Sequence, residues 1–374
     1  MSDIEILCNL IDIPSQLGID NEKKISIYLK EILQKYGFKI EEYEFEKDRP
    51  NIIATYCFSK KGPTILFNGH MDTMPFINGE DEWKTKPDKA TIISDKIYGR
   101  GACDMKGGIA SALAAVFRCI KEDKGCGKVI INLVSDEEST SLYGTVPLCK
   151  KGLLKADFAI VMEPTECKVC PQQLGNMFFK TYIKGCGGHT GLPENKTNPF
   201  DLAFKYIEGL KKWASNKKKN PDDEHPFINV GNFKGGTSSG TIPSNCELFW
   251  GTRVLPEDNF EDYVNEIKKV TEKFRNKIPN NCKIFTELFE GGGTDSFNCE
   301  SPYIDKLIDL SKKQKSIFPA SSDAGFICNI SKINAVVYGP GSLKQAHISN
   351  EFVKIADLNK CTETLYEFLI SIGE

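Results

Sequence analysis

The sequence lacks the features that mark a membrane or secreted protein. It has no apolar run near the roughly 20 residues that a membrane-spanning helix needs. Its first residues, Met1 to Glu5, are acidic where a signal peptide would be basic. It also lacks a charge excess, because 48 Lys and Arg oppose 51 Asp and Glu, and the net charge is -3. We therefore expect a cytoplasmic protein that binds neither nucleic acid nor a membrane surface.

Closely spaced cysteines are rare, although the sequence has 14 cysteines in all. They are scattered from Cys8 to Cys361, and a chain of this length does not need disulfides to fold, so we expect buried free thiols. The one close pair, Cys167 and Cys170, forms a Cys-x-x-Cys without a second pair at zinc-ribbon spacing. A thiol-redox protein built on this pair is an alternative. This alternative predicts thiol-dependent activity that survives metal removal. The sequence around the pair lacks the thioredoxin-like context that the motif requires.

The length of 374 residues predicts two domains, and the first segment has the pattern of an α/β domain. Between residue 3 and about residue 170, helical and strand patterns alternate. The expected strands are 51–56, 64–67, 129–134 and 158–161, and a helix is expected over 105–121. This alternation predicts a mostly parallel central sheet.

Residues 176–289 follow a different order: strand, helix, strand, strand, helix, strand. This is the ferredoxin-like β-α-β-β-α-β unit, and it suits a small inserted domain. We therefore expect a catalytic, metal-binding domain over 1–175 and 290–374, with the insert at 176–289. The triglycine at 291–293 is a plausible hinge between them.

Histidine is scarce, with four in the chain, so the position of each one is informative. His70 follows the strand that ends at Phe67, where loops of open α/β sheets bind ligands. Asp72 could accept the second imidazole N–H and fix the tautomer of His70. Alone, this pattern is more typical of a structural histidine.

Acidic residues follow several of the other expected elements. Asp104 has glycines on both sides, so its two carboxylate oxygens could bridge two cations, although a simple helix cap fits equally well. Glu137 and Glu138 follow the strand over 129–134, and adjacent acids there repel unless a cation compensates. Neighbours in an extended segment point oppositely, so one glutamate could bind metal while the other faces a substrate. Glu163 follows the strand over 158–161.

His347, on a Gly-Pro loop, completes a set of two histidines and three carboxylates with a spare glutamate. Mixed nitrogen and oxygen ligands suit zinc best, with Mn(II) or Co(II) possible. In a two-metal site, the cations polarise the scissile carbonyl and acidify a bridging water. Glu137 would take the proton of that water and pass it to the leaving amine.

Five segments together resemble the acetylornithine deacetylase and succinyl-diaminopimelate desuccinylase family of zinc peptidases. They are 68–73, 99–108, 136–138, 162–165 and 345–347. The resemblance implies that one zinc is bound by His70 and Glu163, the other by Glu138 and His347, and that Asp104 bridges them. It implies that Asp72 orients His70 and that Glu137 is the general base.

The resemblance also assigns roles within the insert, which corresponds to the family's lid and dimerisation domain. His189 resembles the histidine that stabilises the developing oxyanion, in its own or in the partner subunit. Arg253 resembles an arginine that binds a substrate carboxylate. The chain departs from the family at 239–241 and at Gly325, which puts substrate specificity in doubt. His225 matches no family position, and we expect it in a surface loop.

The expected substrate is a small N-acylated amino acid. The stretch 339–347 is closer to acetylornithine deacetylases, so the first expectation is N-acetylornithine deacetylation, with two zinc ions per subunit in a homodimer. A succinyl-diaminopimelate desuccinylase, an aminoacylase or a dipeptidase remains open. A non-catalytic ligand-binding relative would have lost a metal ligand or Glu137, and none is missing.

Overall fold

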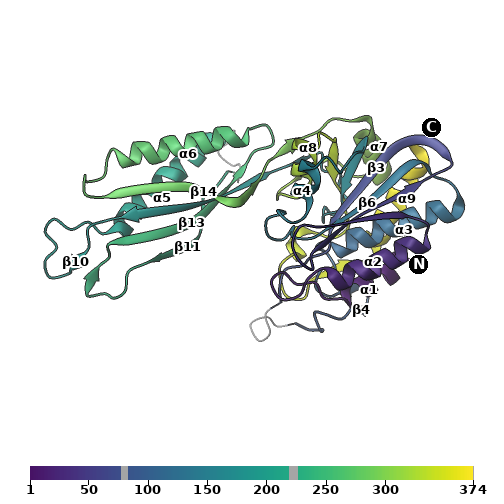
Figure 1. Ribbon diagram of the computed structural model, residues 1–374, viewed down its shortest axis with the longest axis horizontal. Helices are drawn as coiled ribbons and strands as arrows, with labels where there is room; N and C mark the ends of the chain where they lie inside the picture. Colours follow the sequence, from purple (N-terminus) through teal and green to yellow (C-terminus); the bar gives the residue numbers. More distant parts are fainter. Residues whose placement is uncertain (77–82, 219–225, 374) are drawn as a thin grey trace. The chain divides into compact units, whose positions relative to one another are not determined.

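The computed structural model describes residues 1–76, 83–218 and 226–373 and divides the chain into two compact units (Figure 1). Unit 1 comprises Met1–Gln173 and Phe297–Glu374, and unit 2 comprises Leu174–Ser296. Each unit has its own cluster of buried apolar side chains. The triglycine expected as a hinge instead lies inside strand β14 (Lys283–Thr294), and His225 lies outside the described residues.

Unit 1 is built on a six-stranded sheet with the order β1-β2-β6-β3-β7-β17. Its strands are β1 (Lys39–Glu44), β2 (Pro50–Cys57), β3 (Lys60–His70), β6 (Cys126–Val134), β7 (Phe158–Val161) and β17 (Ala335–Val337). The last four in the sheet order are parallel, while β1 and β2 run antiparallel at one edge. The prediction of a mostly parallel α/β sheet is therefore confirmed. Fully buried runs such as that of β7 are typical of a sheet covered on both faces.

The helices of unit 1 pack around this sheet (Figure 1). They are α1 (Asp3–Ile11), α2 (Lys23–Lys35), α3 (Lys106–Glu122), α4 (Thr145–Lys150), α7 (Pro302–Ser311), α8 (Ala324–Asn329) and α9 (Ile355–Ser371). The small side chains of α3 let it pack closely against α1 and α9. In the described part of the chain, no helix is both long enough and apolar enough to cross a bilayer.

Short elements complete unit 1. One three-stranded sheet contains β4 (Thr91–Ile93), β5 (Lys96–Tyr98) and β18 (Phe352–Lys354), and another contains β8 (Gln172–Gln173), β15 (Phe297–Asn298) and β16 (Ile317–Phe318). A 3-10 turn, η1, spans Leu343–Gln345. Because these strands are two or three residues long, hydrophobic periodicity does not reveal them.

Unit 2 has the β-α-β-β-α-β order expected for the insert. Its elements are β9 (Gly175–Lys184), α5 (Pro199–Lys217), β11 (Asn229–Gly235), β13 (Asn245–Val254), α6 (Phe260–Arg275) and β14. The antiparallel sheet has the order β11-β13-β9-β14, and both helices cover the same face (Figure 1). A small ribbon of β10 (Gly188–His189) and β12 (Thr241–Ile242) extends it.

Candidate metal centre

Four parallel strands of unit 1 end at the same edge of the sheet. His70, the last residue of β3, pairs with Val134, the last residue of β6. Val161, which ends β7, pairs with Val337, which ends β17. The segments that follow these strands therefore emerge side by side, at the edge where open α/β sheets bind ligands.

The first group of ligand-type side chains consists of His70, Asp104 and Glu163. The His70 Nε2 atom lies 3.2 Å from Asp104 Oδ1 and 3.7 Å from Glu163 Oε1. One atom from each residue lies within 4.8 Å of the others, and all three residues are buried. One nitrogen and two oxygens at this spacing can surround a single cation.

The second group consists of Asp104, Glu138 and His347, so Asp104 belongs to both groups. The His347 Nε2 atom lies 3.2 Å from Asp104 Oδ2 and 2.8 Å from Glu138 Oε2. The two oxygens of Asp104 thus face different histidines. The alternative role of Asp104 as a helix cap is not seen, because Met105 occupies the N-cap of α3 and no side chain caps it. The geometry matches a carboxylate that bridges two cations.

The electrostatics of the two groups favour divalent cations. Burial, together with Asp104 and Glu137, raises the pKa of Glu163 well above its ordinary value. Hydrogen bonds to Asp104 and Glu138 raise the pKa of His347 to about 10. Buried carboxylates this close repel each other, and positive charge relieves that repulsion. The donor set of imidazole and carboxylate therefore fits zinc, and it also accepts Co(II) or Mn(II).

The prediction that the Asp72 carboxylate orients His70 is not what the structure shows. The His70 Nδ1 atom lies 2.9 Å from the backbone oxygen of Asp72, whereas the nearest carboxylate oxygen is 3.7 Å away. The Asp72 carboxylate instead accepts hydrogen bonds from the backbone N–H groups of Glu137 and Glu138, at 3.3 and 3.0 Å. One residue thus positions the imidazole through its carbonyl and the acidic pair through its side chain.

Glu137 and Glu138 lie in a turn, so the prediction that they belong to an extended segment is wrong. The turn starts at Asp136, which has a φ of 70° and pairs with Arg49 Nη1 at 2.9 Å. Glu138 points to His347, while Glu137 Oε2 lies 3.9 Å from His70 Nε2. Because the backbone turns here, both side chains face the same centre. Glu137 belongs to neither ligand group among the described residues.

Glu351 is buried beside the centre, although no motif in the sequence predicted a role for it. Its carboxylate accepts hydrogen bonds from the backbone N–H groups of Gly101, Cys103 and Asp104, at 3.1, 2.8 and 3.1 Å. It also pairs with Arg100 Nη1 at 2.9 Å. These bonds hold the loop that presents Asp104. The only sequence signal was that Arg100 lies among the loop glycines, and Glu351 itself belongs to no motif.

Asp323 is a second buried acid for which the sequence predicted no role. It accepts hydrogen bonds from Ser141 Oγ at 2.9 Å and from Thr145 Oγ1 at 2.6 Å. Both donors follow the Glu137 turn in the chain. Asp323 therefore connects that turn to the start of α8, which also contains the atypical Gly325.

Two predicted site residues, His189 and Arg253, lie in unit 2, whereas the ligand groups lie in unit 1. His189 is exposed in β10, and its Nδ1 accepts a hydrogen bond from Gly191 N at 3.0 Å. Arg253 is partly buried near the end of β13.

All fourteen cysteines are free and most are buried, as expected. The Cys167 and Cys170 thiols contact backbone oxygens of Asp357 and Lys168 rather than each other. The alternative of a thiol-redox centre at this pair gains no support from these contacts.

Comparison with known proteins gives the same family over most of the chain. Residues 66–371 match Peptidase family M20/M25/M40. A succinyl-diaminopimelate desuccinylase of Rickettsia akari is 30% identical, over 92% of this chain and 93% of that protein. An acetylornithine deacetylase of Aliivibrio fischeri is 25% identical, over 89% of this chain and 87% of that protein.

The fold agrees with these matches. The crystal structure of an M20 family metallo-carboxypeptidase from Sulfolobus solfataricus superposes with a TM-score of 0.81 at 21% identity, covering 100% of this chain and 99% of the other. The chain is therefore a metallohydrolase that belongs to Peptidase family M20/M25/M40.

Proposed function

We propose that the protein hydrolyses the amide bond of a small N-acylated amino acid, with Glu137 as the general base. The observation that carries this proposal is the position of Glu137. Its carboxylate lies 3.9 Å from His70 Nε2, next to two ligand groups that share Asp104, yet it belongs to neither group. An acid beside a metal centre that does not bind the metal is available for proton transfer.

The proposed centre holds two cations, zinc in the first instance. His70 and Glu163 would hold one, Glu138 and His347 the other, and Asp104 both. When bound, such a pair of metals supplies Lewis acidity to the scissile carbonyl and lowers the pKa of water.

The protein's own residues supply the proton transfer. Burial raises the pKa of Glu137 well above its ordinary value, and the nearby acids Asp323 and Glu138 add to this effect. A carboxylate with a raised pKa can accept a proton from the attacking water and then donate it to the leaving nitrogen. The backbone bond from Glu137 N to Asp72 holds the base in place during both steps.

We assign two supporting roles to unit 2. Arg253 binds the carboxylate of the amino acid, because a guanidinium can do so with two parallel hydrogen bonds. His189 stabilises the developing oxyanion. We also infer a cytoplasmic homodimer that associates through unit 2, and sedimentation of the full chain tests the dimer.

The test of mechanism is Glu137→Gln, which keeps the shape of the side chain and removes the base. We expect unchanged zinc content and a fall in turnover of at least about a hundredfold, as is typical of general acid-base groups. Glu166→Gln is the matched control, since Glu166 is a partly exposed acid that pairs with Lys168 and belongs to neither ligand group. Equal turnover in Glu137→Gln and the parent would assign the base to another group.

The substrate is tested with the zinc-loaded enzyme and a panel of amides. N-acetylornithine comes first because of the stretch 339–347, and N-succinyl-diaminopimelate comes next because of the desuccinylase relatives. Simple N-acetyl amino acids and dipeptides complete the panel. If neither chelated nor zinc-restored protein cleaves any of them, the proposed function is wrong.

A further inference from the structure

Two cysteines of unit 1 lie in direct contact. Cys299 follows β15, and Cys328 lies in α8. Their sulfur atoms are 3.3 Å apart, close enough for one thiol to donate a hydrogen bond to the other. The two residues are 29 positions apart in the sequence, so no Cys-x-x-Cys motif marks them. A disulfide, in which the sulfurs are about 2.05 Å apart, needs only a short further approach.

The contact makes the pair reactive. The hydrogen bond from Cys328 lowers the pKa of the Cys299 thiol to about 7, against the effect of burial. The same bond, together with burial, raises the pKa of Cys328 well above its ordinary value. Because either sulfur can be the donor, the pair shares one readily lost proton. A substantial fraction of the pair is therefore thiolate at neutral pH, and the thiolate is the form that reacts with oxidants.

Access to solvent distinguishes this pair from a second one. The Cys167 and Cys361 thiols also lie in contact, but both residues are 0% exposed inside the core of unit 1. Cys328 is partly exposed, and Cys299 is 9% exposed. A small oxidant such as hydrogen peroxide therefore reaches the Cys299–Cys328 pair more readily than the core pair.

Helix α8 connects the pair to the proposed metal centre. Cys328 lies near the end of α8, and Asp323 occupies its N-cap. Asp323 accepts hydrogen bonds from Ser141 Oγ at 2.9 Å and from Thr145 Oγ1 at 2.6 Å. The helix also packs against α4, which starts at Thr145 (Figure 1). A displacement of α8 is therefore transmitted to the segment that directly follows Glu138.

The other side of the pair is held in place. The backbone N–H of Cys299 donates a hydrogen bond to Pro171 O at 2.9 Å, and β15 pairs with β8 just before it. Helix α8 has six residues, and no side-chain hydrogen bond caps its first turn. We therefore expect the approach of the two sulfurs to move α8 rather than β15.

We propose that Cys299 and Cys328 form a reversible disulfide that pulls on α8 and loosens the turn carrying Glu137 and Glu138. The proposal rests on the proposed function, because it describes the regulation of that same centre. It makes the thiol pair an oxidation site and α8 the element that carries its effect.

Hydrogen peroxide is the oxidant in the proposed reaction. The Cys299 thiolate attacks one peroxide oxygen, the O–O bond breaks, and a sulfenic acid and hydroxide form. The Cys328 sulfur then attacks the sulfenic sulfur, the S–O bond breaks, and the S–S bond forms. The two hydroxides leave as water with the two thiol protons, so two thiols and one peroxide give one disulfide and two waters. A dithiol reductant reverses the reaction by thiol–disulfide exchange.

The oxidation is tested by treating the zinc-loaded full chain with hydrogen peroxide and mapping its disulfides by mass spectrometry. We expect a cross-link between Cys299 and Cys328 that dithiothreitol removes. Cys328→Ser should lack it and accumulate a sulfenic acid at Cys299, which dimedone traps. Cys57→Ser, which removes an exposed thiol at the end of β2, is the matched control and should form the cross-link like the parent. No cross-link in the parent, or one between Cys328 and Cys149, overturns the proposal.

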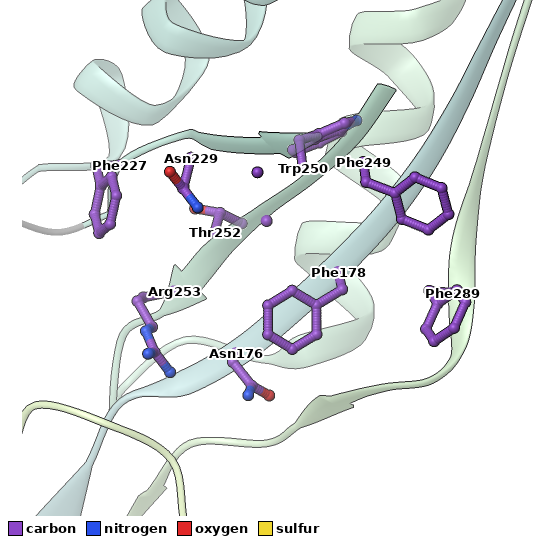
Figure 2. Close-up of a pocket in the computed structure, with 11 residues that line it drawn as sticks. Asn176, Phe178, Phe227, Asn229, Phe249, Trp250, Thr252, Arg253 and Phe289 are labelled. Atoms are coloured by element: carbon purple, nitrogen blue, oxygen red, sulfur yellow. The ribbon is translucent and has the colours of Figure 1, made fainter. Parts of the chain in front are cut away.

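Hydrogen exchange tests the effect on the turn without depending on metal or substrate. The amides of residues 139–145 should exchange at least about tenfold faster in the cross-linked protein than in the reduced one. Strand β13 of unit 2, which carries Trp250 and Arg253, is the internal reference and should not change (Figure 2). Peroxide-treated Cys328→Ser should exchange like the same variant before treatment. Equal exchange of residues 139–145 in the cross-linked and reduced parent overturns the proposal.

Zinc affinity, measured by competition with a chelator, links the disulfide to the centre. We expect cross-linking to weaken zinc binding at least about tenfold, because the loosened turn carries the proposed ligand Glu138. If the reduced protein binds zinc and the cross-linked protein binds it equally well, the proposal is wrong and the metal centre stands. If the cross-link accelerates exchange in the turn but the reduced protein binds no zinc, the disulfide stands and the proposed function fails.

Discussion

At the scale of single residues, Glu351 determines the shape of the loop that carries Asp104. One carboxylate accepts three backbone N–H groups and the Arg100 guanidinium, and its side chain is only 1% exposed. These donors would otherwise be buried without partners, which costs more than the bonds contribute. The position of the proposed bridging ligand therefore depends on a residue distant from it in the sequence.

Replacing Glu351 tests this dependence. We expect Glu351→Gln to weaken zinc binding roughly 10- to 100-fold, because outer-shell partners hold ligands in place. Breaking the buried pair with Arg100 should also destabilise unit 1 by about 3 kcal/mol. Zinc affinity is measured by competition with a chelator. Glu363→Gln is the control, since Glu363 is an exposed partner of Arg118. A zinc affinity equal to that of the parent would show that the loop keeps its shape without Glu351.

At the scale of elements, the start of α3 lies directly on the end of β7. A Cβ at Gly108 would lie 2.0 Å from the backbone oxygen of Met162, the residue before Glu163. Only a glycine lets the helix approach the strand this closely. Asp104, just before α3, and Glu163, just after β7, are thereby brought within reach of one cation.

Gly108→Ala should separate these two elements. We expect a loss of about 2–3 kcal/mol, in the upper range for overpacking. This corresponds to a fall of roughly 5–10 °C in the unfolding temperature of unit 1, measured by circular dichroism. Gly209→Ala in α5 has open space around it and should instead stabilise unit 2 slightly, as alanine is the better helix former. Equal thermal stability of Gly108→Ala and the parent would mean that α3 shifts freely.

At the scale of the whole molecule, each of the two units has its own hydrophobic core among the described residues, and all five proposed metal ligands belong to unit 1. A ligand that binds only folded protein stabilises the part that binds it. Unit 2 contributes none of the residues in the two ligand groups.

Metal removal should therefore affect the units unequally. We expect chelation to lower the unfolding temperature of unit 1, by an amount equivalent to about 4 kcal/mol if free zinc had been present at 1,000 times its dissociation constant. Hydrogen exchange of the amides in β9 and β13 should not change, while that of β3 and β7 should increase. We would measure calorimetric unfolding and hydrogen exchange before chelation, after chelation and after zinc is restored. An equal increase in amide exchange rates in both units after chelation would show that the two units unfold together.

Much of the fold was predictable because local patterns carry it. The apolar runs predicted β7 over its full range of Phe158–Val161, and the Ala-rich helical pattern predicted α3 to within one residue at each end. The strand and helix order of unit 2 was likewise visible. The short strands of the smaller sheets, such as β4, β8 and β16, were not, because two or three residues carry too little of a periodic pattern.

The sequence by itself determined the set of ligand-type side chains, since His70, Asp104, Glu138, Glu163 and His347 all follow recognisable strands or glycine-rich turns. Only the tertiary structure decided how they are held. The turn at Asp136 directs both Glu137 and Glu138 toward the proposed metal centre. The backbone oxygen of Asp72 contacts the His70 imidazole, and Glu351 holds the loop that carries Asp104. The physical reason is that these contacts join segments far apart in the chain, whose meeting depends on the register of parallel strands rather than on any local preference.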